Sequence, residues 1–166
     1  MVILVMGTTG AGKTTVGKLI AQKLGWNFLD ADDFHPQANI EKMKHGIPLT
    51  DVDRGPWLAN MHSRLRQLTA EKQNAVLACS ALKQSYRDTL SAGLDFRIVY
   101  LRGTYEQMRK HILARHGHFA GESILAGQFA DLEEPTDALM LDVAGTPESL
   151  ADRAIEGLGL TPAAAG

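Results

Sequence analysis

The chain has 166 residues, a length that suits one domain with its own hydrophobic core and leaves little room for a second. Hydrophobic residues make up 45% of the sequence and charged residues 22%, as in an ordinary soluble globular protein. The formal net charge of −2 argues against the basic surface of a nucleic-acid-binding protein, so any anionic ligand must be held by a local site.

One cysteine, Cys79, ends an apolar run at residues 75–79. A single cysteine cannot form a disulfide within the chain, and its neighbours predict a small buried hydrophobe in preference to a reactive thiol. This cysteine usage is consistent with a reducing cytoplasm. The apolar residues 1–6 are too few for a signal peptide or a membrane span, so we expect a buried strand there and no membrane partner.

Short apolar runs alternate with amphipathic patterns along the chain. In the first amphipathic pattern, apolar residues from Val16 to Leu24 share one helical face, and Gly25 follows where a left-handed C-cap would lie. Further helices are expected near residues 53–71 and from Pro147 to about 158. Strands are expected at residues 2–6, 26–29, 75–79, 96–101 and 139–143. This alternation predicts an α/β domain on a five-stranded parallel sheet.

Residues 1–160 are predicted to form this single domain. The segment at about 116–127 interrupts the pattern before the last strand, and its three glycines, Gly117, Gly121 and Gly127, suit a mobile lid. The small residues at 161–166 suit a disordered tail.

Residues 7–14 read GTTGAGKT and match the phosphate-binding P-loop pattern G-x-x-x-x-G-K-[ST]. A predicted strand precedes them and a predicted helix follows, so a chance glycine-rich turn is the weaker interpretation. Backbone N–H groups of such a loop surround phosphates. We expect Lys13 to reach the β- and γ-phosphates of ATP and Thr14 to bind Mg²⁺. The predicted nucleotide contacts are Gly7, Thr8, Thr9, Gly10, Ala11, Gly12, Lys13, Thr14 and Thr15.

Three carboxylates follow the second predicted strand, in the run DADDFHP that starts at Asp30. In an open α/β sheet the carboxyl ends of the strands line the ligand crevice. We expect Asp30 to lie in the Mg²⁺ shell and Asp32 to accept the proton of the attacking hydroxyl. Asp33 is more simply explained as a solvated or capping residue of a turn. His35 either binds a substrate hydroxyl or caps the turn.

Basic side chains that could hold a substrate anion follow in the later loops. Lys83 and Arg87 are four residues apart and would share a helix face, although a solvated face paired with Asp88 is the alternative. Arg54 is a further candidate for an anion clamp. Arg115 opens the predicted lid, where an arginine can stabilise the transferring phosphoryl group and act as a catalytic residue together with Lys13 and Asp32. Arg109 and Lys110 are nearby alternatives for this role.

The histidines near the predicted lid, His111, His116 and His118, could in principle bind a metal. Their spacing suits one helix face poorly and no cysteine or carboxylate cluster joins them, so this interpretation is not favoured. The adenine contacts are not marked by any pattern, and residues 143–147 near the last strand are our candidates.

The chain resembles the gluconate kinase (gluconokinase) family over about residues 2–158. Besides the phosphate loop, the resemblance rests on DADDFHP at 30–36, NIEKM at 39–43, GIPL at 46–49 and DVDRGPWL at 51–58. It continues with CSALK at 79–83, YRD at 86–88, GHF at 117–119, QF at 128–129, LE at 132–133 and Pro135. Many families share the phosphate loop, whereas this whole set is specific.

The resemblance implies a P-loop NTPase fold like that of adenylate kinase, with three α/β/α layers and a lid. It implies phosphorylation of D-gluconate at O6 with ATP and Mg²⁺, a cytoplasmic location and often a homodimer. Asp32 and Arg54 would face the sugar acid, and Lys83 and Arg87 would lie near it. His118 belongs to the shared GHF motif and is counted among the substrate contacts.

One departure from the family is His111, which stands four residues before Arg115 where relatives commonly have an arginine. This puts a nucleotide contact at that position in question. Composition and spacing alone do not separate gluconate from shikimate or another small hydroxy acid, so a small-acid kinase is the alternative. A non-catalytic nucleotide switch is disfavoured because residues 101–106 lack the N-K-x-D sequence of a GTPase.

Overall fold

The computed structural model describes residues 1–116 and 122–165. Its centre is a five-stranded, all-parallel sheet in the order β2-β3-β1-β4-β5. The strands are β1 (Val2–Met6), β2 (Asn27–Asp30), β3 (Ala75–Ala78), β4 (Phe96–Arg102) and β5 (Leu139–Asp142). Each strand boundary lies within one residue of the predicted boundary, so the predicted α/β class with a parallel sheet is confirmed.

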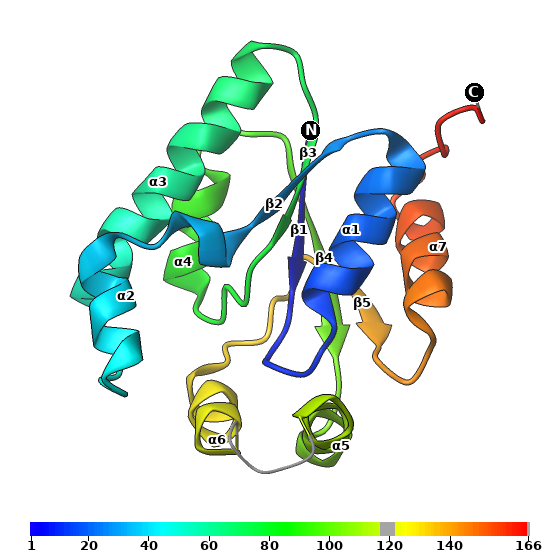
Figure 1. The fold of residues 1–166 in the computed structure, drawn as a ribbon. Coiled ribbons are helices and arrows are strands. Elements are labelled where there is room, and N and C mark those ends of the chain that lie inside the picture. The colour runs from blue at the N-terminus through cyan, green and yellow to red at the C-terminus, as the bar shows by residue number, and fades with distance from the viewer. Residues whose placement is uncertain (117–121, 166) are drawn as a thin grey trace.

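Helices cover both faces of the sheet and make three layers (Figure 1). In chain order they are α1 (Lys13–Leu24), the 3-10 helix η1 (Ala31–Phe34), α2 (Gln37–Lys44), α3 (Asp51–Ala70), α4 (Gln84–Ser91), α5 (Tyr105–His116), α6 (Glu122–Asp131) and α7 (Pro147–Gly157). Helices α1 and α7 pack on one face, and α3 and α4 pack on the other. Helices α5 and α6 lie beyond the carboxyl ends of the strands (Figure 1).

Strand β1 shows how the sequence supplies both cores. Val2, Leu4 and Met6 belong to the buried cluster formed with α3 and α4. Ile3 and Val5 belong to the opposite cluster, formed with α1 and α7. Because successive side chains of a strand point to opposite faces, a central strand covered on both sides needs this uninterrupted apolar run.

Local sequence decides where the helices begin and end. Gly25 adopts the left-handed conformation after α1, with φ 69°, as the predicted C-cap requires. At the start of α3, the side chains of Thr50 and Asp53 each accept a hydrogen bond from the backbone N–H of the other. This capping box starts the helix at Asp51, two residues before the predicted start.

The predicted lid at 116–127 lies partly outside the described residues. Its later part, from Glu122, forms the first turns of α6, so a helix stands where the sequence pattern suggested an interruption. Residues 161–165 have no regular secondary structure, and the backbone N–H of Ala163 donates to the carbonyl oxygen of Lys23 at 2.8 Å. None of the helices among the described residues is long and apolar enough to span a bilayer.

Candidate active site

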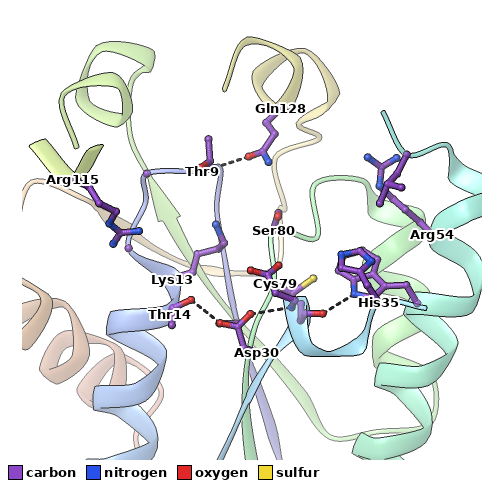
Figure 2. Close-up of a pocket in the computed structure, with 17 residues that line it drawn as sticks. Thr9, Lys13, Thr14, Asp30, His35, Arg54, Cys79, Ser80, Arg115 and Gln128 are labelled. Carbon is purple, nitrogen blue, oxygen red and sulfur yellow. Dashed lines mark hydrogen bonds between the residues drawn. The ribbon is translucent and has the colours of Figure 1, made fainter. Parts of the chain in front are cut away.

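Three strand ends lie level and bring three loops together. Val5 of β1 pairs with Ala78 of β3, and Ala78 pairs with Asp30 of β2. The phosphate loop therefore leaves β1 beside η1, which leaves β2, and beside the loop that carries Cys79 and Ser80 after β3. With residues of α3, α5 and α6, these loops line a pocket of about 340 Å³ (Figure 2). Open α/β sheets bind ligands at this edge.

The phosphate loop has the backbone shape that its glycines predict. Gly10 and Gly12 are left-handed, with φ of 85° and 84°. A Cβ atom on Gly10 would also lie 2.8 Å from the carbonyl oxygen of Met108, so this position needs glycine for space as well as conformation. Helix α1 begins at Lys13 without a side-chain cap, which leaves its first N–H groups for an anionic ligand.

Lys13 lines the pocket from the first turn of α1. Its Nζ atom donates to the carbonyl oxygen of Thr8 at 3.1 Å. Burial lowers the pKa of the ammonium group, and the nearby carboxylates of Asp32 and Asp30 act in the opposite direction. A polyphosphate bound in the loop would add negative charge here and favour the charged lysine.

Thr14 and Asp30 place two oxygen groups side by side at the floor of the pocket (Figure 2). The Thr14 hydroxyl donates to one carboxylate oxygen of Asp30 at 2.9 Å, and the other carboxylate oxygen accepts from the backbone N–H of Asp32 at 3.0 Å. A hydroxyl and a carboxylate beside a phosphate loop are the hard donors that Mg²⁺ binds, together with water and phosphate. The residues present therefore fit the expected Mg²⁺ site.

Asp32 lines the same pocket from η1. Partial burial is the main cause that raises the pKa of its carboxyl group, and the Asp30 carboxylate raises it further. His35 and Lys13 act in the opposite direction. A carboxylate with a raised pKa is a stronger proton acceptor than an ordinary one. Asp33, its neighbour in η1, does not line the pocket.

His35 is held in a defined orientation. Its ring stacks on Trp57, with 4.6 Å between centroids and 8° between planes. The buried Asn39 amide nitrogen lies 3.3 Å from His35 Nδ1 and donates to the Asp53 carbonyl oxygen at 3.0 Å. Because an amide nitrogen only donates, Nδ1 accepts and the ring hydrogen of neutral His35 is on Nε2. Burial lowers the pKa of His35, which favours this neutral ring and gives the pocket a hydrogen-bond donor.

Arg54 reaches the pocket from the first turn of α3 (Figure 2). Its Nη1 atom donates to the Tyr86 hydroxyl at 3.5 Å and lies 3.9 Å from the Asp51 carboxylate. Asp51 also accepts a hydrogen bond from the Tyr86 hydroxyl and pairs with Lys83 at 3.2 Å. Of this group Arg54 lines the pocket, whereas Lys83, also expected to contact the substrate, does not.

Arg87 lies inside the protein, with only 1% of its surface exposed, and does not line the pocket. Its guanidinium donates to Ala81 O at 2.7 Å, Leu82 O at 3.0 Å, Gln84 Oε1 at 2.9 Å and Glu133 O at 2.8 Å. These bonds fasten the loop after β3 to the segment after α6, so the structure does not bring Arg87 to a substrate anion. The two side chains expected to act together have different surroundings, because Lys83, the N-cap of α4, pairs with Asp51 whereas Arg87 is buried.

A second pocket, of about 480 Å³, adjoins the phosphate loop. Gly10, Gly12 and Arg115 line both pockets, so phosphates of a nucleotide whose base lies in the second pocket would run past Arg115 into the first. Three of the candidate adenine contacts line this second pocket: Val143, Gly145 and Pro147. His111 lines it too, and its Nδ1 atom lies 2.8 Å from the Gly10 carbonyl oxygen. His118 lies outside the described residues.

Gln128 and Trp57 line the pocket although the sequence analysis gives neither a site role. Gln128 accepts a hydrogen bond from the backbone N–H of Thr9 at 2.6 Å (Figure 2). The apolar pattern of α3 places Trp57 in the core, and it is buried, but it also lines the pocket, stacks on His35 and donates to the Ala31 carbonyl oxygen at 2.7 Å. Trp57 is hidden in an apolar stripe, and Gln128 is one polar residue on a short helix, which carries no periodic signal.

Similar sequences are found among gluconokinases. The family model for shikimate kinase matches residues 9–122. A gluconokinase of Gluconobacter oxydans is 46% identical over 136 residues, covering 81% of this chain and 76% of its own. The thermoresistant gluconokinase of Escherichia coli is 37% identical over 160 residues, covering 93% of this chain and 91% of its own.

Solved structures show the same fold. A gluconokinase from Sinorhizobium meliloti superposes with a TM-score of 0.85 at 41% identity, over 95% of this chain and 90% of that one. A sugar kinase from Janibacter superposes with a TM-score of 0.87 at 38% identity, over 99% and 98%. At 20% identity, an APS kinase from Mycobacterium tuberculosis, with a TM-score of 0.63, shares the fold alone. By its identity to relatives over most of its length, the chain belongs to the gluconokinase family of P-loop kinases.

Proposed function

We propose that this chain transfers the γ-phosphoryl group of ATP to O6 of D-gluconate, which gives 6-phosphogluconate and ADP. The observation that carries the proposal is the lining of the 340 Å³ pocket, which joins the phosphate loop to Asp32 and Arg54. The phosphate-binding loop, a proton acceptor (Asp32) and a positively charged side chain (Arg54) thus line the same pocket. Gluconate has matching groups, because it carries a carboxylate at one end and a primary hydroxyl at the other.

In the proposed mechanism, Arg54 binds the gluconate carboxylate and so orients O6 toward the phosphate loop. Asp32 accepts the proton of the O6 hydroxyl while O6 forms a bond to the γ-phosphorus and the bond to the β–γ bridging oxygen breaks. Lys13 and Arg115 stabilise the negative charge on the transferring group and on ADP. His35 donates from Nε2 to a hydroxyl of the sugar acid.

Thr14 and Asp30 would hold Mg²⁺, and their 2.9 Å hydrogen bond already sets both groups at the phosphate loop. When bound, Mg²⁺ neutralises charge on the β- and γ-phosphates. The chain's own contribution is to place the hydroxyl of Thr14 at the first turn of α1 and the carboxylate of Asp30 at the end of β2.

We also propose a cytoplasmic homodimer in which His118 contacts the substrate. The support is the family resemblance of the sequence, including the GHF motif at 117–119. The second candidate acceptor is shikimate, which is favoured by the family model that matches residues 9–122. Gluconate is preferred because relatives at 37% and 46% identity are gluconokinases.

A coupled ADP-release assay with ATP and Mg²⁺ tests the proposal over gluconate, shikimate, glycerate, AMP and no acceptor. We expect strong turnover with gluconate and the acceptor-free rate with the rest. Turnover with shikimate in place of gluconate would establish the second candidate. A rate with gluconate no higher than the acceptor-free rate would overturn the proposal.

Asp32→Asn tests the proton acceptor, and we expect kcat to fall by about a hundredfold or more. The raised pKa of Asp32 means that folding disfavours its charged form, so the wild-type carboxylate costs stability at neutral pH. The variant should therefore melt at the wild-type temperature or higher. A lost activity accompanied by a lower Tm would instead indicate a structural role for Asp32.

A further inference from the structure

The hydrogen bond between Thr9 and Gln128 links the phosphate loop to α6. The backbone N–H of Thr9 donates to the side-chain oxygen of Gln128 at 2.6 Å, across 119 residues of sequence (Figure 2). Within the loop, by contrast, the Ala11 N–H donates to the neighbouring Thr8 carbonyl oxygen at 3.2 Å. A phosphate-loop N–H is thus occupied by a neutral oxygen from another element, at a place where such groups bind phosphate oxygens.

The two pockets show which end of the nucleotide this hydrogen bond faces. Thr9 and Gln128 line the 340 Å³ pocket together with Lys13 and Asp32, and neither lines the 480 Å³ pocket. Gly10, next to Thr9, lines both. The Thr9 N–H therefore lies on the acceptor side of the loop, where the terminal phosphate of ATP would lie and where ADP has none.

Helix α6 is fixed well enough to hold the Gln128 side chain at this point. Leu125 is fully buried in the core shared with α5, and Phe129 packs edge-on against Tyr105 with 5.6 Å between ring centroids. Just beyond α6, the backbone N–H of Glu133 donates to the Leu82 carbonyl oxygen at 2.8 Å. The side-chain oxygen of Gln128 is thus a positioned acceptor.

We propose that Gln128 is a positioning residue that competes with the terminal phosphoryl group of ATP for the Thr9 N–H. This inference rests on the proposed use of ATP. One N–H makes one strong hydrogen bond, so a γ-phosphoryl oxygen that takes the Thr9 N–H displaces the Gln128 oxygen. ADP leaves the bond between Thr9 and Gln128 intact. The released carboxamide then faces the acceptor pocket, and it recaptures Thr9 once the phosphoryl group has moved to the acceptor.

The consequence is a change in the relative affinities for ATP and ADP. Binding of ATP costs the protein one hydrogen bond that binding of ADP does not cost. Gln128→Met removes the competing oxygen and keeps a long, unbranched, helix-compatible side chain, so the ratio of ATP to ADP affinity should rise about three- to tenfold. Gln128→Glu keeps an acceptor for Thr9 and adds a negative charge beside the γ-phosphate, so the same ratio should fall by at least a similar factor.

Titration calorimetry of the purified full chain with MgADP and with Mg-β,γ-imido-ATP, without acceptor, measures this ratio. The opposite signs of the two variants are the critical result, because a merely structural role would weaken both nucleotides in both variants. Ratios that stay within twofold of wild type, or that move in the same direction, would overturn the proposal.

Gln67 provides the matched control. It is an exposed glutamine in the last turn of α3, hydrogen-bonded to Glu71, and does not line either pocket. Gln67→Met and Gln67→Glu should leave the ratio unchanged. The binding ratio is measured without gluconate, so a failure of gluconate turnover would overturn the proposed acceptor and leave this test intact. If the wild-type protein binds neither nucleotide, both the proposed use of ATP and the proposed role of Gln128 are overturned.

Discussion

The first turns of α3 and α4 belong to packed neighbours and each carries an arginine, yet the two guanidinium groups have opposite surroundings. Arg54 is 28% exposed in its side chain, opens onto the pocket, and has a tyrosine hydroxyl and one carboxylate nearby. Arg87 is buried and donates to three backbone carbonyl oxygens and one side-chain oxygen.

The difference shows what decides the use of an arginine. Three backbone carbonyl oxygens converge on Arg87 from the loop after β3 and the segment after α6, and buried carbonyl groups need donors. Arg54 meets no such set of carbonyl oxygens in the described part of the chain, so its charge stays available to a ligand. Arginine thus holds backbone carbonyl groups at the start of α4 and stays available to a ligand at the start of α3.

The largest expected effect comes from Arg87→Met. Removal of the guanidinium takes a donor from the carbonyl groups of Ala81, Leu82 and Glu133, of which Leu82 keeps the N–H of Glu133. We expect the free energy of unfolding to fall by about 3–5 kcal/mol. Urea unfolding followed by circular dichroism measures it. If the variant instead kept wild-type stability and showed a raised KM for gluconate, Arg87 would act in substrate binding, and its contrast with Arg54 would be wrong.

Arg54→Ala should weaken the binding of gluconate and leave the stability of the fold nearly unchanged. Loss of a charged hydrogen bond to the carboxylate of the acceptor predicts a KM for gluconate about 10- to 100-fold higher, with Tm nearly unchanged. Steady-state kinetics with varied gluconate at saturating ATP provide the measurement, and Arg54→Lys, which keeps the charge without the planar fork, should recover part of the loss. An unchanged KM for gluconate in Arg54→Ala would show that Arg54 does not bind the gluconate carboxylate.

The pH dependence of thermal stability tests how Asp53 holds the start of α3. The hydrogen bonds from Lys42 and Thr50 lower the pKa of Asp53 to about 2. Because the folded-state pKa is below the ordinary value of 3.8, this stabilisation is present above about pH 4 and is lost as the pH falls toward 2. Asp53→Asn should therefore lower Tm at pH 6 and narrow its difference from wild type at pH 2.5. Thermal unfolding at both values checks this, and a constant difference would contradict it.

The smallest effect is expected for Lys83→Ala. Lys83 pairs with Asp51 at the surface, where such pairs contribute little, and it does not line the pocket. We expect Tm and the KM for gluconate to stay within about 2 °C and about twofold of wild type. A tenfold rise in KM would show that Lys83 leaves Asp51 to bind the substrate, and would place it with Arg54.

The sequence was sufficient where one local rule decides the outcome. Short apolar runs predicted all five strands of the described residues, and the glycines of the phosphate loop predicted its backbone shape. It was also sufficient to place Asp32 at the pocket, because residues after parallel strands converge at one edge of the sheet.

The sequence was not sufficient where the outcome depends on partners far along the chain. The burial of Arg87 depends on the carbonyl oxygen of Glu133, 46 residues away, and the contact of Gln128 depends on Thr9, 119 residues away. Periodicity within a helix contains no record of such partners. The same limit applies to Lys83, whose pairing with Asp51 depends on how α3 and α4 pack.

The level ends of β1, β2 and β3 have a consequence for how this protein can vary in evolution. Each residue added within a strand shifts the loop at its carboxyl end by about 3.3 Å, enough to separate Asp30 from Thr14. The turns at the opposite edge of the sheet, at Lys72 before β3 and Gly93 before β4, are remote from this alignment. Insertions and deletions among natural variants should therefore gather at those turns and avoid the three loops at the strand ends, where one residue more would disassemble the site.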